Sequence, residues 1–195
     1  MATGPIYRVP LKRRRSGRTN YYRRRGLLKS GELRLVIRRS NNNITVQFVE
    51  SKIDGDITKT AVVSRNLKKY GWNITGGNIP ASYLTGYLAG KIAGSKGIDY
   101  AILDLGLQVS QAGSKIYAAL KGVIDAGVEI PASEEIFPPE DIIKGAHIAK
   151  YSASLKKEDK KKYEHMYAGY LAAKQNPEDI EKHFEKTIKA IDKEF

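Results

Sequence analysis

The sequence predicts an α/β fold with a mixed sheet, made by an antiparallel three-strand meander followed by an α-β-α unit. A basic extended N-terminal arm precedes it and a helical C-terminal extension follows. Dense charge without periodicity at the start, alternating apolar residues over 33–63 and helically spaced apolar residues thereafter predict this order. We expect an arm at residues 1–31, an α/β core domain at 32–137 and the extension at 138–195.

Positive charge is concentrated at the N-terminus. Residues 1–39 contain 13 lysines and arginines and one acid, whereas residues 40–195 contain 21 basic and 20 acidic residues. Residues 1–30 show neither the period of a strand nor that of a helix, so we expect an extended segment that only a polyanion orders. This asymmetry is the usual electrostatic footprint of a nucleic-acid contact.

Alternation of apolar and polar residues predicts the meander. "LRLVIRR" and "ITVQFV" flank the turn sequence "SNNN", and "ITKTAVV" follows a second turn at residues 54–56. Because side chains alternate along a strand, Arg34 and Arg38 share one face, opposite the leucines. The sheet is therefore expected to carry a basic stripe.

The segment "PASYLTGYLAGKIAGSKG" predicts a helix with Pro80 in its first turn and Asn78 as its cap. Gly86, Gly90 and Gly94 recur every fourth residue, which leaves one side of the helix almost bare. Another backbone can approach that side closely. The neighbour is expected to be either the sheet or RNA.

A short apolar run at residues 100–107, "YAILDLGL", predicts a central strand covered on both faces. "GSKIYAALKGVIDAG" predicts a second helix, with Ser114 as a plausible cap and Gly127 as its stop. The residues "VEI" before Pro131 are consistent with one more short strand.

Short charged helices are expected after Pro138. Asn176 and Pro177 mark the start of the last one, on which Ile180, Phe184, Ile188 and Ile191 form an apolar stripe that must dock on another part of the protein. The lysine cluster over residues 156–162 is consistent with either a solvated helix face or an RNA contact.

Several classes of protein are disfavoured. There is no cysteine, and His147, His165 and His183 form no ligand motif, so no metal or cofactor is expected. No apolar run approaches the roughly 20 residues of a membrane span. The basic start lacks the apolar region of a secretory signal, and its prolines and glycines would break the helix of a transit peptide. We expect a cytoplasmic protein without membrane contact.

Asp104 is the residue that most invites an enzymatic interpretation. Ribonuclease-H-like folds place a catalytic aspartate on a strand, and Asp99 and Asp125 are possible companions for binding metal ions. However, no spacing specifies such a cluster, and a buried aspartate bonded to backbone amides explains Asp104 equally well. The expected protein is not an enzyme.

The arm instead suits RNA. Arginine donates two hydrogen bonds to phosphate and keeps its charge. Tyr7, Tyr21 and Tyr22 can stack on unpaired bases, or can dock on the protein's own surface. Looped RNA exposes bases more readily than duplex DNA does, so RNA is the expected partner. A general DNA-coating protein remains an alternative.

Four segments carry a resemblance to a known family: "GPIYRVPLKRRRSGRTNYYRRRGLL", "GWNITGGNIPASYLTGYLAGKIAG", "GIDYAILDLGL" and "GSKIYAALKGVIDAGVEIP". Together they resemble the archaeal form of the universal L-eighteen family of ribosomal proteins, whose eukaryotic counterpart is called L-five. The resemblance runs from Ala2 to about Tyr151. The remaining residues resemble, more loosely, the C-terminal extension of archaeal and eukaryotic members.

The resemblance implies a structural protein of the large ribosomal subunit that binds 5S rRNA and attaches it to 23S rRNA at the central protuberance. The implied partners are these two RNAs and neighbouring large-subunit proteins, including the other 5S rRNA-binding protein; a homo-oligomer is not expected. The candidate RNA-binding residues are Tyr7, Arg8, Lys12, Arg13, Arg14, Arg15, Arg18, Tyr21, Tyr22, Arg23, Arg24, Arg25, Lys29, Arg34, Arg38, Arg39, Ser40, Asn41, Asn42, Lys68, Lys69, Trp72 and Asn78.

Overall fold

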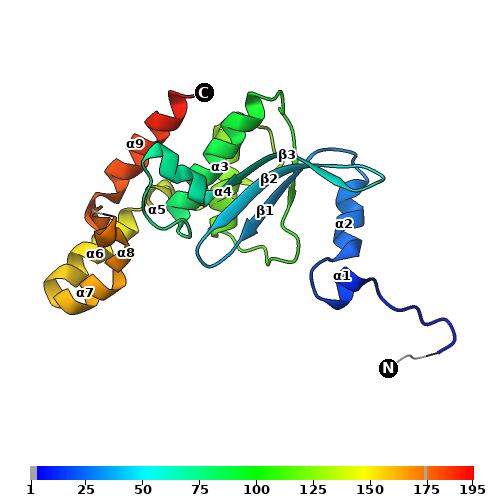
Figure 1. Ribbon diagram of the computed structural model, residues 1–195, viewed down its shortest axis with the longest axis horizontal. Helices are drawn as coiled ribbons and strands as arrows, with labels where there is room; N and C mark the ends of the chain where they lie inside the picture. Colours follow the sequence, from blue (N-terminus) through cyan, green and yellow to red (C-terminus); the bar gives the residue numbers. More distant parts are fainter. Residues whose placement is uncertain (1–3, 174) are drawn as a thin grey trace.

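The computed structural model describes residues 4–173 and 175–195, and within them it contains one mixed sheet (Figure 1). Its strands lie in the order β3-β2-β1-β4. They are β1 (Arg34–Arg39), β2 (Ile44–Ser51), β3 (Asp56–Val63) and β4 (Ile102–Asp104). β2 pairs antiparallel with both β1 and β3, and β4 pairs parallel with β1. The predicted α/β class and the meander are confirmed.

One face of the sheet forms the core with two helices, α3 (Ile79–Gly94) and α4 (Lys115–Asp125). Leu35 pairs with Phe48 and Ile37 with Val46, and all four side chains are fully buried. Alternation of apolar residues puts these pairs on the face toward the helices. The opposite face carries no helix of the core, and it is the face that the arm approaches.

The expectation that the sheet or RNA packs against the bare side of α3 was wrong. Its neighbour is neither the sheet nor RNA but helix α4. A Cβ on Gly86 would overlap the carbonyl oxygen of Ala119, and one on Gly90 would lie 2.6 Å from the Cβ of Ala126. Gly122 of α4 meets the backbone of α3 in the same way. Both helices contribute glycine, which lets their backbones pack closely.

The expectation of a central fourth strand was also wrong. β4 spans three residues and lies at the edge of the sheet, because the described residues add no strand beyond it but only one isolated bridge between Tyr100 and Glu129. The "VEI" segment therefore forms a bridge and not a strand, since Pro131 follows it directly and provides no further backbone N–H to pair.

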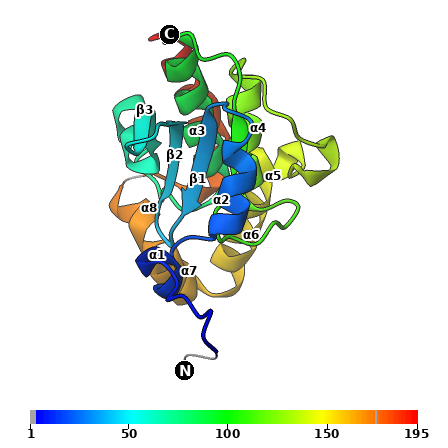
Figure 2. The ribbon, with the colours of Figure 1, turned by 90° about the vertical axis from the view of Figure 1, so that its right-hand side faces the viewer.

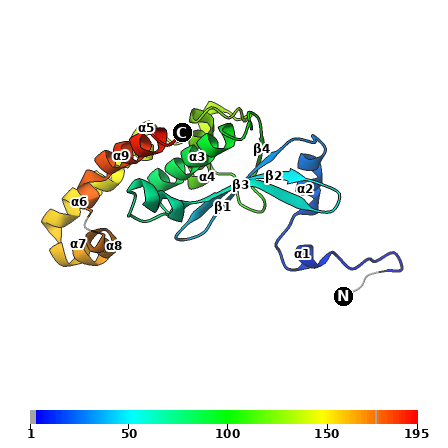
Figure 3. The same cartoon turned by 45° about the horizontal axis from the view of Figure 1, so that its top comes forward.

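The C-terminal extension is helical, as predicted. It contains α5 (Glu140–Lys144), α6 (Ala146–Glu158), α7 (Lys160–Met166), α8 (Ala168–Ala172) and α9 (Ile180–Asp192). Ile180, Phe184 and Ile191 of α9 are buried, and Phe184 packs against Tyr83 of α3 with ring centroids 5.6 Å apart. The extension lies at the opposite end of the elongated molecule from the arm (Figure 3).

The arm is not fully extended, which differs from the expectation. It contains two short helices, α1 (Lys12–Arg15) and α2 (Tyr21–Leu28). The side chain of Asn20 accepts hydrogen bonds from the backbone N–H groups of Tyr22 and Arg23, so it caps α2. This local cap nucleates a helix that the absence of hydrophobic periodicity concealed. Arm and helices nonetheless project from the body (Figure 1).

Three short 3-10 helices complete the described chain: η1 (Ser64–Tyr70), η2 (Glu134–Ile136) and η3 (Pro177–Asp179). In the described residues no helix is both long enough and apolar enough to span a bilayer.

Candidate nucleic-acid interface

The arm presents an exposed basic surface. Arg8, Lys12, Arg13, Arg14, Arg15, Arg18, Arg23, Arg25 and Lys29 are all exposed. None of these side chains forms a salt bridge to an acid within residues 4–173 and 175–195. Such unneutralised cations are available to release counterions from a polyanion, so this surface suits nucleic acid.

One arginine of the arm is committed to the body. The two terminal nitrogens of Arg24 donate to the two carboxylate oxygens of Asp56 at 2.9 and 2.7 Å. Asp56 begins β3, next to the turn that joins it to β2. This bidentate pair ties α2 to the sheet. Figure 2 shows α2 in front of the strands.

Asp56 also forms a salt bridge with a second arginine, Arg34, which links the arm to the sheet. Arg34 of β1 lies 2.8 Å from Asp56 and 2.8 Å from Asp104 of β4, and Arg38 donates to Asp104 at 3.0 Å. The hydrogen bonds from Arg24 and then Arg34 hold the pKa of Asp56 well below its usual range, although burial opposes the shift. Three arginines and two aspartates thus form one charge-alternating network.

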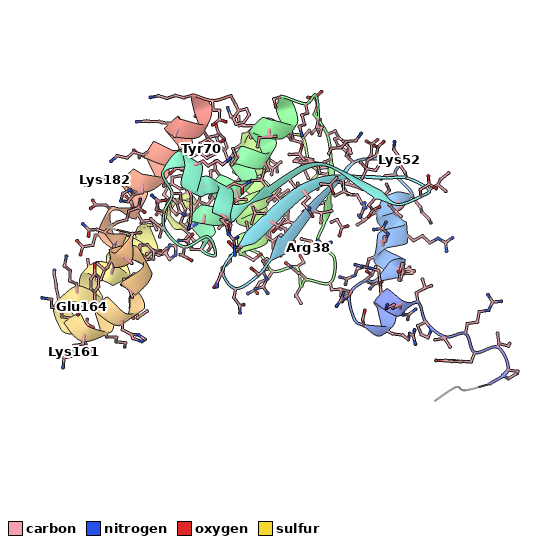
Figure 4. All side chains as sticks on the ribbon, in the orientation of Figure 1. Arg38, Lys52, Tyr70, Lys161, Glu164 and Lys182 are labelled. Atoms are coloured by element: carbon pink, nitrogen blue, oxygen red, sulfur yellow. The ribbon has the colours of Figure 1, made fainter. Side chains whose placement is uncertain are left out.

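This network corrects the expectation of a basic stripe on the sheet. Arg34 is 2% exposed and its charge is compensated by Asp56 and Asp104, so it does not present itself to RNA. Arg38 is half-buried and also paired, with a second bond to the carbonyl oxygen of Asp104 at 2.6 Å (Figure 4). Both arginines do lie on the predicted face, but Asp104, 66 or more residues away, meets them there.

The tyrosines of the arm differ in exposure. Tyr22 is 89% exposed and Tyr7 45% exposed, so neither docks on the protein's own surface. Tyr21, at the start of α2, is half-buried. The first two therefore keep a free aromatic face on which a base can stack.

A second group of candidate residues lies at the other end of the strands. Arg39, Ser40, Asn41 and Asn42 are exposed where β1 turns into β2, and Lys68 and Lys69 are exposed on η1. A Cβ on Gly77 would overlap the carbonyl oxygen of Asn41. The loop between η1 and α3, which contains Gly77, therefore lies directly against the β1–β2 turn. The candidates thus form two surfaces, one on the arm and one at this turn.

Two predicted residues serve the fold instead. Trp72 is 1% exposed and its indole N–H donates to the carbonyl oxygen of Thr75 at 3.2 Å, which contradicts the expectation of an RNA contact. Asn78 caps α3 by accepting from the backbone N–H of Ala81 at 2.9 Å, and its amide donates to the hydroxyl of Tyr170. The capping role of Asn78 was predicted. Because the cap and the bond to Tyr170 use its side chain, Asn78 serves the fold.

Sequence reasoning passed over one residue of the second surface. Arg65 is exposed on η1, three positions before Lys68. Side chains three apart eclipse one another on a 3-10 helix, so the two cations share a face. The spacing of basic residues in "SRNLKKY" is the signal that would have identified it.

Asp104 is not placed for metal chemistry. Its carboxylate accepts from Arg34, Arg38 and the backbone N–H of Gly106, while Asp125 accepts from Tyr83 and pairs with Lys121. No group of three or more potential ligands exists among the described residues. The partners of Asp104 are thus mainly guanidinium groups and one backbone amide.

Comparison with known proteins decides the family. The profile described as "Ribosomal large subunit proteins 60S L5, and 50S L18" matches residues 6–99 and 90–133. The curated "Large ribosomal subunit protein uL18" of Aeropyrum pernix is 49% identical over 196 aligned positions, which cover 100% of this chain and 92% of the relative. The chain belongs to this L5/L18 ribosomal protein family. The resemblance predicted from the sequence is confirmed.

Membership in the L5/L18 family makes the chain a structural protein of the large ribosomal subunit, and so a component of the cytoplasmic ribosome. RNA binding and a part in translation follow from the family, which is a class of ribosomal structural proteins and not of enzymes. The archaeal relative matches along the whole chain, so the C-terminal extension is shared with it.

Proposed function

We propose that this chain binds 5S rRNA through its arm and attaches it to 23S rRNA at the central protuberance, beside the other 5S rRNA-binding protein of the subunit. The arm of residues 1–31, the core of 32–137 and the extension of 138–195 act as separate parts in this proposal. The exposed, uncompensated cations of the arm are the observation that carries it.

Charge and shape support RNA as the partner of the arm. Arg13, Arg14 and Arg15 are consecutive residues of α1, so their side chains leave the helix in different directions and can reach phosphates of more than one strand. Tyr7 and Tyr22 add exposed aromatic faces between the cations. Cations interleaved with aromatic rings suit RNA whose bases are partly unstacked.

The two separate surfaces support an attachment role. The arm enters the sheet at Arg34, the start of β1, whereas Arg39 ends that strand and residues 40–42 lie beyond it. A single RNA helix binding to the arm leaves the β1–β2 turn and η1 accessible to a second RNA segment. We assign the remaining exposed candidates, Arg39, Ser40, Asn41, Asn42, Lys68 and Lys69, to this second contact.

Binding to transcribed 5S rRNA tests the proposal. We expect the quadruple variant Arg13→Gln, Arg14→Gln, Arg15→Gln and Arg18→Gln to lose at least tenfold in affinity at moderate salt, because each side chain contacts a phosphate. Filter binding with 5S rRNA in competition with tRNA and duplex DNA measures both affinity and preference.

The matched control changes the same amount of charge elsewhere. Lys157, Lys160, Lys161 and Lys162 are exposed and form no salt bridge in the described chain, and they lie in the extension (Figure 4 marks Lys161). Their replacement by glutamine is expected to change 5S rRNA affinity less than threefold. Equal losses from the two variants, or duplex DNA displacing 5S rRNA at equal mass, would refute the proposal.

A further inference from the structure

A groove lies between α2, the outer face of the sheet and the loop that follows β4. Its volume is about 640 Å³, within the range of roughly 300 to 1,000 Å³ that is typical of small-molecule sites. Residues of β1, β2 and β3 form its floor, α2 and the segment before it form one wall, and residues 105–107 form the other. The arm and the sheet therefore border an open groove that neither forms alone.

Two valines and one amide lie on the floor of the groove, next to the paired side chains of Arg34 and Arg38. Val36 and Val49 are 9% and 6% exposed although they lie on the face away from α3 and α4. Gln47 pairs directly with Val36 across the strands, so their side chains are neighbours on this face. The amide of Gln47 forms no hydrogen bond with another side chain or backbone group among residues 4–173 and 175–195. A donor and an acceptor thus stand free beside the two valines.

The lining of the groove is positively charged. Six arginines line it against two aspartates, Asp56 and Asp104. Arg24, Arg34 and Arg38 are paired with these aspartates. The other three, Arg13, Arg18 and Arg23, have no acidic partner in the described part of the chain, so the groove carries a net charge of +4. A ligand that fills it must be anionic at its rim and apolar but hydrogen-bonding at its centre.

We propose that this groove holds a single unpaired nucleotide of the bound rRNA, with its base on the floor and its phosphates at the rim. This rests on the proposed function and adds a specific site to it. A base offers a flat apolar face to Val36 and Val49, and its edge offers donors and acceptors to Gln47. Its flanking phosphates meet the unpaired arginines.

The same features argue against other anions. A paired nucleotide presents its base edge to its complement, so a duplex can reach the arginines but not Gln47. An acidic peptide satisfies the arginines and leaves the apolar floor unused. Only an unstacked nucleotide uses both the charge of the walls and the chemistry of the floor.

Variants of Gln47 test the site. Gln47→Trp fills the groove, and Gln47→Leu removes its amide at similar volume. Fluorescence anisotropy with labelled hexauridylate and hexaadenylate is expected to show at least a tenfold weaker affinity for Gln47→Trp and about a threefold weaker one for Gln47→Leu. Affinity for a blunt 12-base-pair RNA duplex is expected to change less than twofold, because the duplex binds only the walls.

Thr45→Trp and Thr45→Leu are the matched controls. Thr45 lies on the same strand and face, two residues from Gln47, and does not line the groove. These variants are expected to bind every probe within twofold of the original protein. Thermal unfolding of each variant identifies those that fold. If Gln47→Trp does not fold, the affinities of Gln47→Leu test the nucleotide site.

The outcomes separate the groove from the wider proposal. Equal losses for single-stranded and duplex probes, or no loss with either Gln47 variant, overturn the nucleotide site. Displacement of hexauridylate by hexaglutamate at equal concentration overturns it as well, since the ligand would then need only charge. Loss of 5S rRNA preference in competition with tRNA refutes the proposed function while the hexanucleotide measurements remain valid.

Discussion

Arg34 and Asp104 stand 70 residues apart in sequence, and their side chains meet at 2.8 Å in the buried part of the sheet's outer face. The pair joins β1 to the short edge strand β4. Through Asp56, Arg34 is also linked to Arg24 of the arm. The orientation of the arm therefore depends on buried charges on the outer face of the sheet, and not only on exposed contacts.

Asp104→Asn is expected to destabilise the fold by about 3 kcal/mol, because it leaves the 3%-exposed guanidinium of Arg34 with less compensation for its burial. Urea unfolding monitored by circular dichroism measures the loss. A loss below about 1 kcal/mol would contradict the role of the network.

The double variant Arg34→Met with Asp104→Leu is the control for that prediction. Replacement of a buried ion pair by apolar residues of similar volume is often neutral. We expect the double variant to be more stable than Asp104→Asn alone. If it is less stable, the pair contributes packing that charge does not explain.

Asp56 predicts a pH dependence. Its pKa is held below the ordinary value of about 3.9, so the unfolded chain binds the proton more readily and the contribution of Asp56 is fully present above that value. As pH falls through its folded pKa, this contribution is lost. The stability difference between the original protein and Asp56→Asn should be constant from pH 5 to 7 and should shrink as the pH falls below about 4. A difference that grows on acidification would reverse the assigned sign.

Gly86→Ala is expected to be strongly destabilising, because its Cβ would overlap the carbonyl oxygen of Ala119 in α4. Separation of α3 and α4 disturbs the centre of the core, so a loss of about 3 kcal/mol or failure to fold is expected. Gly94→Ala, at the end of the same helix, meets nothing within 4 Å and should stabilise by about 0.5 kcal/mol. Thermal unfolding compares the two, and equal effects would refute close packing as the reason for glycine.

Phe184→Ala tests how the extension is held. Phe184 is 3% exposed and lies against Tyr83, so its truncation should cost about 3 to 4 kcal/mol and free α9 from α3. Hydrogen exchange should accelerate in residues 180–192 and remain slow in β1 and β2. Lys186→Ala, an exposed change on the same helix, is the control. Unchanged exchange in Phe184→Ala would show that other contacts hold α9.

Local periodicity predicted the meander, α3, α4 and the apolar stripe of α9, because each pattern is written in consecutive residues. The partner of the glycines on α3 was mistaken because α4 lies about 30 positions later and its own glycine, Gly122, gives no local sign of the pairing. The fourth strand was mistaken because an apolar run does not reveal whether a strand is central or at an edge.

In the candidate site, too, local features could be predicted and contacts between distant residues could not. The exposed cations of the arm could be predicted from charge alone, whereas the burial of Arg34 required knowledge that Asp104 pairs with it across parallel strands. Trp72 was a candidate RNA contact implied by the family resemblance, yet the loop folds its indole into the core. The groove could not be predicted at all, since it exists only where α2 stands beside the outer face of the sheet.

The salt dependence of 5S rRNA binding tests the central claim most directly. Each phosphate contact adds about 0.7 to 0.9 to the slope of log K against log salt concentration. The quadruple variant of Arg13, Arg14, Arg15 and Arg18 should therefore show a slope smaller by about 3 than that of the original protein. An unchanged slope over about 50 to 200 mM KCl would contradict the arm as the electrostatic contact with RNA.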